Sequence, residues 1–240
     1  MTTDARDHVL AEVRRALGGA RLPDAAVSHP GSFGGSPEVP APGDRALIAR
    51  FGAELEALHG TLHRASSAAD AARVAGALVE RHGARRVLAW SERWLGCPGL
   101  LAVLQQAGVE VTAVNLGADR ASRRARLEDI EPIIVGLTGA EAGLADTGSL
   151  VLVSGPGRSR LASLLPPVHI ALLPEARVYP TLPAFLAARP GVLAEGSSLV
   201  LVTGPSRTAD IEMTLTHGVH GPREVHVIVV PQPTSANPMT

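Results

Sequence analysis

Apolar positions divide the chain into an N-terminal helix, a polar linker and a long region of mixed helices and strands. Between residues 3 and 17 apolar side chains recur at helical spacing. The segment 28–43, SHPGSFGGSPEVPAPG, is rich in proline, glycine and serine, which predicts a linker or surface loop. We therefore predict an N-terminal helix and Pro/Gly-rich linker over residues 1–43 and one α/β domain over residues 44–240.

Helical spacing returns over residues 44–58 and 67–83, and strand and helix patterns then alternate. Short apolar runs predict strands at 86–90, 109–114, 133–135, 149–154, 168–173, 198–202 and 225–230, and helical patterns occupy 98–107, 122–128 and 181–188. This alternation predicts a mainly parallel sheet flanked by helices. The later strands are apolar enough to be buried, so we expect the chemistry in the loops at strand ends.

Composition narrows the classes of function. The chain has 240 residues, 45% of them hydrophobic, a net charge of −1 and only 2% aromatic residues. These values support a packed core but predict no general affinity for nucleic acid or anionic membranes. The N-terminus is not a signal peptide, and no apolar run approaches the ~18 residues of a membrane span, so we expect a cytoplasmic protein.

The basic and thiol side chains are unusual. All 22 basic residues are arginine, so lysine chemistry is excluded and any anion held by a basic side chain is held by arginine. Cys97 is the single cysteine, so the chain alone can form neither a disulfide nor an iron–sulfur cluster. No G-x-G-x-x-G occurs, so a dinucleotide site is not supported and the cofactor stays unknown.

The polar stretch TGPSRTADIE, residues 203–212, follows the apolar run 198–202. We expect a turn at Gly204 and the first turn of a helix from Ala209, which would offer free backbone N–H groups to an anion. The expected ligand-binding residues of this loop are Gly204, Ser206, Arg207 and Thr208. A carboxylate or a phosphate would suit them equally, and the alternative is a capped helix with Thr208 as its N-cap.

Two acids and a histidine are the candidate catalytic groups. Asp146 precedes Thr147 and Gly148 at the start of a strand, and Asp210 follows another strand. If those strands are neighbours, the two carboxylates converge and can divide acid and base roles, with Thr147 and Gly148 in the ligand site. Otherwise Asp146 braces its turn. His220 is a candidate acid or base.

Other polar groups are weaker candidates. His217 and His220 could bind a metal, but glycines beside them favour an irregular loop, so we expect no metal site. Arg158 and Arg160 either add positive charge near Asp146 or are solvated surface residues. Glu141 is a possible nucleophile with nothing local to activate it.

Several stretches together resemble the LUD-domain family, in its lactate-utilisation protein C branch. They are ADTGS at 145–149, LLPPVHI at 164–170, GPSRTADIE at 204–212 and GVHGP at 218–222, in order within residues 130–230. Ser149 stands where the family usually has threonine, which keeps the hydroxyl. The resemblance implies a NagB/RpiA/CoA transferase-like α/β fold.

The resemblance also implies a function. It points to a subunit of an L-lactate-oxidising assembly, with iron–sulfur clusters in partner proteins and a small carboxylate ligand. Two alternatives stay open: a freestanding sugar-phosphate isomerase or CoA transferase that binds a phosphate, and a non-catalytic ligand-binding or assembly module that docks through the N-terminal helix.

Overall fold

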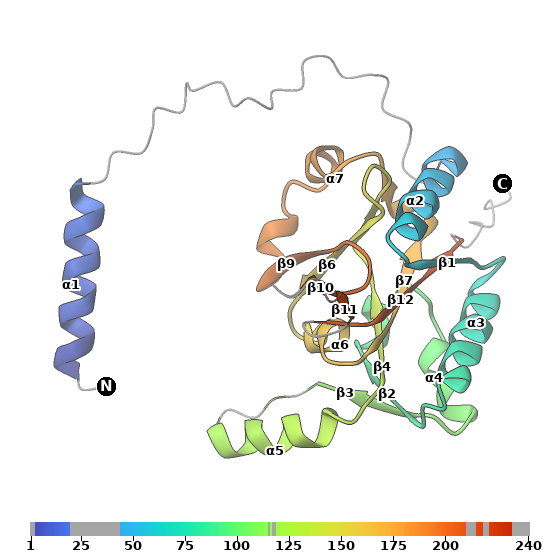
Figure 1. The fold of residues 1–240 in the computed structure, drawn as a ribbon, viewed down its shortest axis with the longest axis horizontal. Coiled ribbons are helices and arrows are strands. Elements are labelled where there is room, and N and C mark those ends of the chain that lie inside the picture. Colours follow the sequence, from blue (N-terminus) through green and yellow to red (C-terminus); the bar gives the residue numbers. More distant parts are fainter. Residues whose placement is uncertain are drawn as a thin grey trace, which may run out of the picture. The chain divides into compact units, whose positions relative to one another are not determined.

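The computed structural model describes residues 3–19, 44–114, 116, 119–209, 215–217 and 221–231. The chain divides into two units, Met1–Glu38 and Val39–Thr240. The first unit contains helix α1 (Thr3–Gly19), whose described apolar side chains, Val9, Leu10 and Val13, are exposed. The second unit contains all other described elements (Figure 1).

The larger sheet of the second unit is parallel throughout. Its strands lie in the order β1-β12-β7-β4-β2-β3, and each neighbouring pair is parallel. They are β1 (Thr61–Arg64), β2 (Arg86–Ala89), β3 (Glu110–Ala113), β4 (Val135–Gly139), β7 (Val168–Pro174) and β12 (Glu224–Val230). The predicted α/β class with a mainly parallel sheet is confirmed.

Helices pack against the sheets of the second unit, with α7 on β5 and β8, and side-chain caps fix where several of them begin. They are α2 (Arg45–Ala57), α3 (Ala68–Arg81), α4 (Leu100–Gln106), α5 (Arg120–Ile130), α6 (Leu161–Leu164) and α7 (Leu182–Ala188). Helices α3 and α4 pack side by side, and α3 contacts β12 (Figure 1). Asp44, Ser67 and Thr181 accept backbone N–H groups in the first turns of α2, α3 and α7. These three capping residues are the first residues of the ranges for which the sequence predicts helices.

A second, four-stranded sheet was not predicted. Its order is β8-β5-β6-β9, with β5 (Ala142–Leu144), β6 (Ser149–Ser154), β8 (Val178–Tyr179) and β9 (Ser198–Val202). Strand β6 is antiparallel to β5 and β9 because the turn through Gly148, at φ 63°, reverses the chain. The expectation that Asp146 borders a parallel sheet is therefore wrong, and β9 is only partly buried rather than a core strand.

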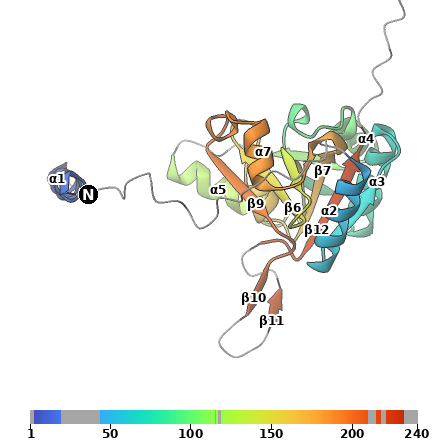
Figure 2. The same ribbon diagram turned by 90° about the horizontal axis from the view of Figure 1, so that it is seen from above.

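The polar stretch after β9 also differs from expectation. Strands β10 (Arg207–Ala209) and β11 (Leu215–His217) pair antiparallel, and Figure 2 shows them standing out from the rest of the fold. The backbone N–H of Ser206 donates to Pro222 O at 2.8 Å, which closes the base of this pair. The expected helical turn from Ala209 is wrong, because that residue belongs to a strand.

Candidate functional site

The Asp146 turn, residues 146–149, meets the start of the 203–206 loop. Ser149 Oγ and Thr203 Oγ1 lie 2.7 Å apart, and Leu150 pairs with Val202 across the two strands. Both loops also touch the end of α2: a Cβ on Gly148 would lie 2.4 Å from Leu55 N, and one on Gly204 would lie 2.9 Å from Leu58 Cβ. Two of the sequence motifs are thus brought together at one end of the smaller sheet.

Asp146 is the predicted catalytic residue whose side chain the structure describes. Its N–H donates to Pro180 O at 3.1 Å, while its buried Oδ1 has no partner among the described residues. Thr147 beside it is exposed. A buried carboxylate oxygen without a donor is costly, so Asp146 is placed to accept a hydrogen bond from a ligand or water.

The rest of the predicted set is only partly placed. Asp210 and His220 lie outside the described residues. Arg207 and Thr208 are placed by their backbone alone, in register with His217 and Thr216. The ligand-binding roles of Arg207 and Thr208 stay predictions. The free N–H groups of a helix, which we expected behind Gly204, do not form at residues 207–209 because these residues belong to a strand.

The structure assembles an arginine cluster that the sequence analysis missed: Arg158, Arg177 and Arg189 around the buried Glu141. Nη1 of Arg158 lies 3.3 Å from Glu141 Oε1, and the Nη1 atoms of Arg177 and Arg189 lie 3.4 and 3.5 Å from Oε2. Arg189 also pairs with Glu195 at 2.8 Å, and this hydrogen bond raises the pKa of Arg189. Glu141 is therefore occupied by ion pairs, which argues against its use as a free nucleophile.

Arg158 is the most buried member of the cluster. Its guanidinium lies over the ring of Trp94, 3.9 Å from the centroid, and its Nη2 donates to Glu195 O at 2.7 Å. Arg158 Nε and Trp94 Nε1 are buried and find no acceptor among the described residues. The expectation that Arg158 lies near Asp146 is wrong, because it follows the opposite end of β6, about 17 Å along the strand.

This cluster lies at the carboxyl edge of the parallel sheet. Glu141 follows β4, Arg177 follows β7 and Trp94 follows β2, and these three strands are neighbours in the order β7-β4-β2. A Cβ on Gly139 would lie 1.9 Å from Trp94 O, so the segment after β2 rests directly on the end of β4. Open α/β sheets bind ligands at this edge, where the order of strands reverses, and here it reverses beside β2.

Charge at the carboxyl edge favours an anion. Three guanidinium groups against the carboxylates of Glu141 and Glu195 leave one positive charge uncompensated. The two unpartnered N–H donors need an acceptor, and a carboxylate is a group that only accepts. Because these residues are far apart in the sequence, only the strand order reveals that they meet.

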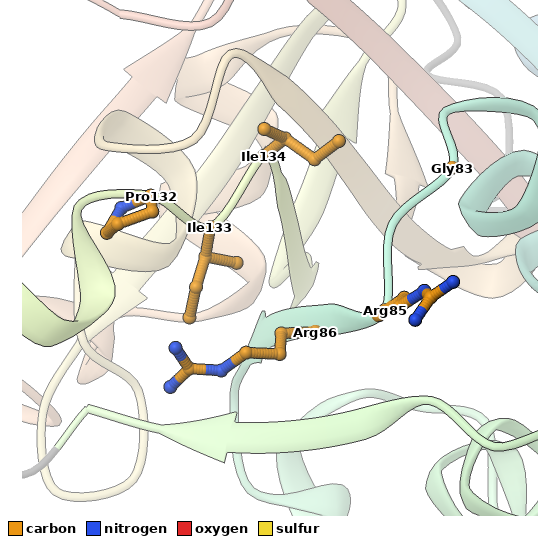
Figure 3. Close-up of a pocket in the computed structure, with 6 residues that line it drawn as sticks. All are labelled: Gly83, Arg85, Arg86, Pro132, Ile133 and Ile134. Carbon is orange, nitrogen blue, oxygen red and sulfur yellow. The ribbon is translucent and has the colours of Figure 1, made fainter.

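The cavities described in the structure lie at the opposite, amino edge. Figure 3 shows one of about 200 Å³ lined by Arg85, Arg86, Pro132, Ile133 and Ile134. Arg86 there is engaged by Glu110 at 3.3 Å and Asp129 at 3.1 Å. A second cavity, of about 590 Å³, lies between α3 and α4 and also contacts Arg85. Neither borders a predicted site residue.

Cys97 lies in the core. Its Sγ donates to Ala68 O at 3.5 Å, and burial followed by the nearby Glu92 carboxylate raises the pKa of the thiol. A single buried thiol does not fit an iron–sulfur cluster, which takes several cysteine ligands. Within the part of the chain that the structure describes, no helix has the length and apolar character to cross a membrane.

The strand order and the helices define an α/β protein with a parallel six-stranded sheet. The chain belongs to the LUD domain family, whose model matches residues 48–230. The solved structure of a DUF162 family protein from Deinococcus radiodurans has a similar fold, with a TM-score of 0.52 and 23% identity; the match covers 77% of this chain and 96% of that one.

Several relatives carry the name lactate utilization protein C. The protein from Halalkalibacterium halodurans is 35% identical over 157 residues, covering 64% of this chain and 66% of that protein. The one from Shouchella clausii is 34% identical, covering 63% and 65%. These alignments span just under two thirds of the relatives' length, whereas that of Deinococcus radiodurans, at 30% identity, covers 95% of this chain and 97% of the relative.

Proposed function

We propose that this chain acts in lactate utilisation, as a cytoplasmic subunit of an L-lactate-oxidising iron–sulfur assembly. The names of its relatives support the metabolic role. Oxidation of lactate to pyruvate releases two electrons and two protons, which need an acceptor. One buried cysteine cannot bind an iron–sulfur cluster, so the clusters belong to partner proteins.

The small carboxylate binds at the carboxyl edge of the large sheet, next to the arginine cluster. The observation that carries this proposal is a pair of buried donors, Arg158 Nε and Trp94 Nε1, which find no acceptor among the described residues and lie within a cluster of net positive charge. Arg177 and Arg189 are partly exposed and can turn toward a ligand from the solvent side. Arginine recognises carboxylates through paired hydrogen bonds.

The 203–208 loop is the second candidate for the same ligand. The unpartnered oxygen of Asp146 favours it, since that carboxylate could orient a substrate hydroxyl. Arg207 would then bind the carboxylate, with Ser206 and Thr208. The two candidates lie at opposite ends of β6, so single substitutions separate them.

Ligand binding by the purified full chain tests the proposal. L-lactate should raise the melting temperature of the wild type, and Arg177→Gln should weaken lactate binding roughly tenfold to a hundredfold through loss of one charged hydrogen bond. Arg207→Gln should bind as the wild type does, and the reverse result moves the site to the 203–208 loop. The control Arg73→Gln removes an exposed arginine that pairs with Asp70 and belongs to neither candidate site.

Competing ligands separate the functional classes. A response to sugar phosphates or CoA but not to L-lactate would overturn the carboxylate proposal and favour the isomerase or transferase alternative. The assembly is tested by purification from the native organism: co-purification of cysteine-rich iron–sulfur proteins is expected, and repeated recovery of this chain alone would contradict it.

A further inference from the structure

Histidines gather at the amino edge of the large sheet, opposite the edge that carries the arginine cluster. His226 lies on β12 two residues after Glu224, so both side chains leave the same side of that strand. His82 follows the last residue of α3, which packs on β12. We propose that His82, Glu224 and His226 form a binding site for a divalent transition-metal ion of the zinc class.

The spacing of the ligand atoms fits a tetrahedral ion. Oε2 of Glu224 lies 3.5 Å from His82 Nε2 and 3.3 Å from His226 Nε2. All three atoms lie within 4.8 Å of one another. Ligands at zinc distances of about 2.0–2.1 Å in a tetrahedron are about 3.3 Å apart. The two distances from Glu224 to the histidines already match this value. Small rotations of the imidazoles would bring the two histidine nitrogens to the same distance from each other.

The chemistry of the donors selects the metal. Two imidazole nitrogens and one carboxylate oxygen suit zinc and its neighbours, whereas Mg²⁺ and Ca²⁺ prefer oxygen ligands alone. Three protein ligands leave a fourth position open to water or to an oxygen of a small molecule. Nε2 of His82 is buried without a hydrogen-bond partner among the described residues, so a metal would satisfy it.

A neighbouring histidine supports the geometry of the site. Nε2 of His63, on β1, lies 3.3 Å from Nδ1 of His226. Metal-binding imidazoles commonly donate their second nitrogen to an acceptor, which fixes the tautomer and leaves the other nitrogen for the metal. His63 is therefore a positioning residue that directs Nε2 of His226 toward Glu224.

One cation competes with the metal. Nη2 of Arg81 lies 3.3 Å from Nε2 of His226, which is the nitrogen that would bind the ion. Arg81 is exposed, so its side chain can swing into solvent when a metal arrives. Its removal should strengthen metal binding, which is the opposite of what removal of a ligand does.

Zinc titration of the chelator-stripped full chain tests the site. We expect one Zn²⁺ per chain, measured by competition with a chromogenic chelator, a raised melting temperature, and no response to Mg²⁺. Co²⁺ in place of Zn²⁺ should give the visible absorption of a tetrahedral site. Failure of the wild type to bind Zn²⁺ would overturn the proposal, whatever the outcome of the lactate experiments.

Variants identify the ligands. Glu224→Gln and His82→Gln should each weaken Zn²⁺ binding at least tenfold, His63→Gln about tenfold, and Arg81→Gln should strengthen it. Glu224 is 48% exposed, so Glu224→Gln should fold normally, which circular dichroism checks. The control His8→Gln replaces an exposed histidine of α1 and should leave binding unchanged. Unchanged affinity in Glu224→Gln and His82→Gln would place the metal elsewhere and refute the assignment.

Discussion

At the scale of single residues, Gly148 and Gly83 have the same backbone conformation but different surroundings. Their φ angles are 63° and 62°, in the left-handed region that residues other than glycine rarely adopt. Gly83 has nothing within 4 Å of a Cβ position, whereas Gly148 would place that atom against the backbone of Glu54 and Leu55. Gly148 is therefore required for close packing of the Asp146 turn on α2, and Gly83 only for its conformation.

Substituting alanine at both positions separates these two requirements. Gly83→Ala should cost about 1 kcal/mol of unfolding free energy from backbone strain alone. Gly148→Ala should cost about 3 kcal/mol or more, because the methyl group must also displace α2. Urea unfolding of both variants measures the difference. Equal losses would mean that the turn does not need its contact with α2.

At the scale of elements, strand β7 is unusual because it is a central strand that contains a buried histidine. It lies between β12 and β4, and residues 168–173 are all buried, including His169. Nε2 of His169 lies 2.8 Å from Thr138 Oγ1, while its Nδ1 has no partner among the described residues. Burial, followed by the nearby His226, lowers the pKa of His169 to about 4. The strand therefore carries a neutral imidazole.

This histidine should make stability depend on pH. The pKa of His169 is lower in the folded state than the ordinary 6.5. The stability contributed by the neutral imidazole is therefore complete above pH 6.5 and is lost as the pH falls toward 4. By pH 4 the free energy of unfolding falls by about 3 kcal/mol from this group. His169→Gln should show a correspondingly shallower decline in urea unfolding across this range, measured with a chelator present. A decline as steep as that of the wild type would show that other groups dominate.

Local sequence patterns predicted most helices and strands but missed several short strands. Helical spacing and short apolar runs gave most of the helices and the principal strands. Strands β1, β5 and β8 were missed because runs of two to four residues carry no measurable periodicity. The 208–216 stretch alternates polar and apolar residues strictly, a strand signal that the sequence analysis did not recognise.

At the scale of the whole molecule, the position of a site depends on strand order, which the sequence does not show. Asp146 and Asp210 were expected to converge if their strands were neighbours. Strands β6 and β9 are neighbours, and Asp210 itself lies outside the described residues. Arg177 and Glu141 were not connected, because their proximity follows from the pairing of β4 with β7. Sites marked by contiguous polar strings were therefore found, and a cluster of single residues assembled across the sheet was not.

Both hydrophobic cores lie within the second unit, which predicts that this unit folds without the N-terminal segment. The buried apolar residues of the described chain run from Leu47 to Val230. A chain of residues 44–240 should thus unfold at the same urea concentration as the full chain and keep the Asp44 cap of α2. A matched truncation that also removes α2 loses the fully buried Phe51 and Leu55 and should fail to fold cooperatively. If removal of residues 1–43 alone lowers the unfolding midpoint, the N-terminal segment is part of the domain and the boundary at residue 44 is wrong.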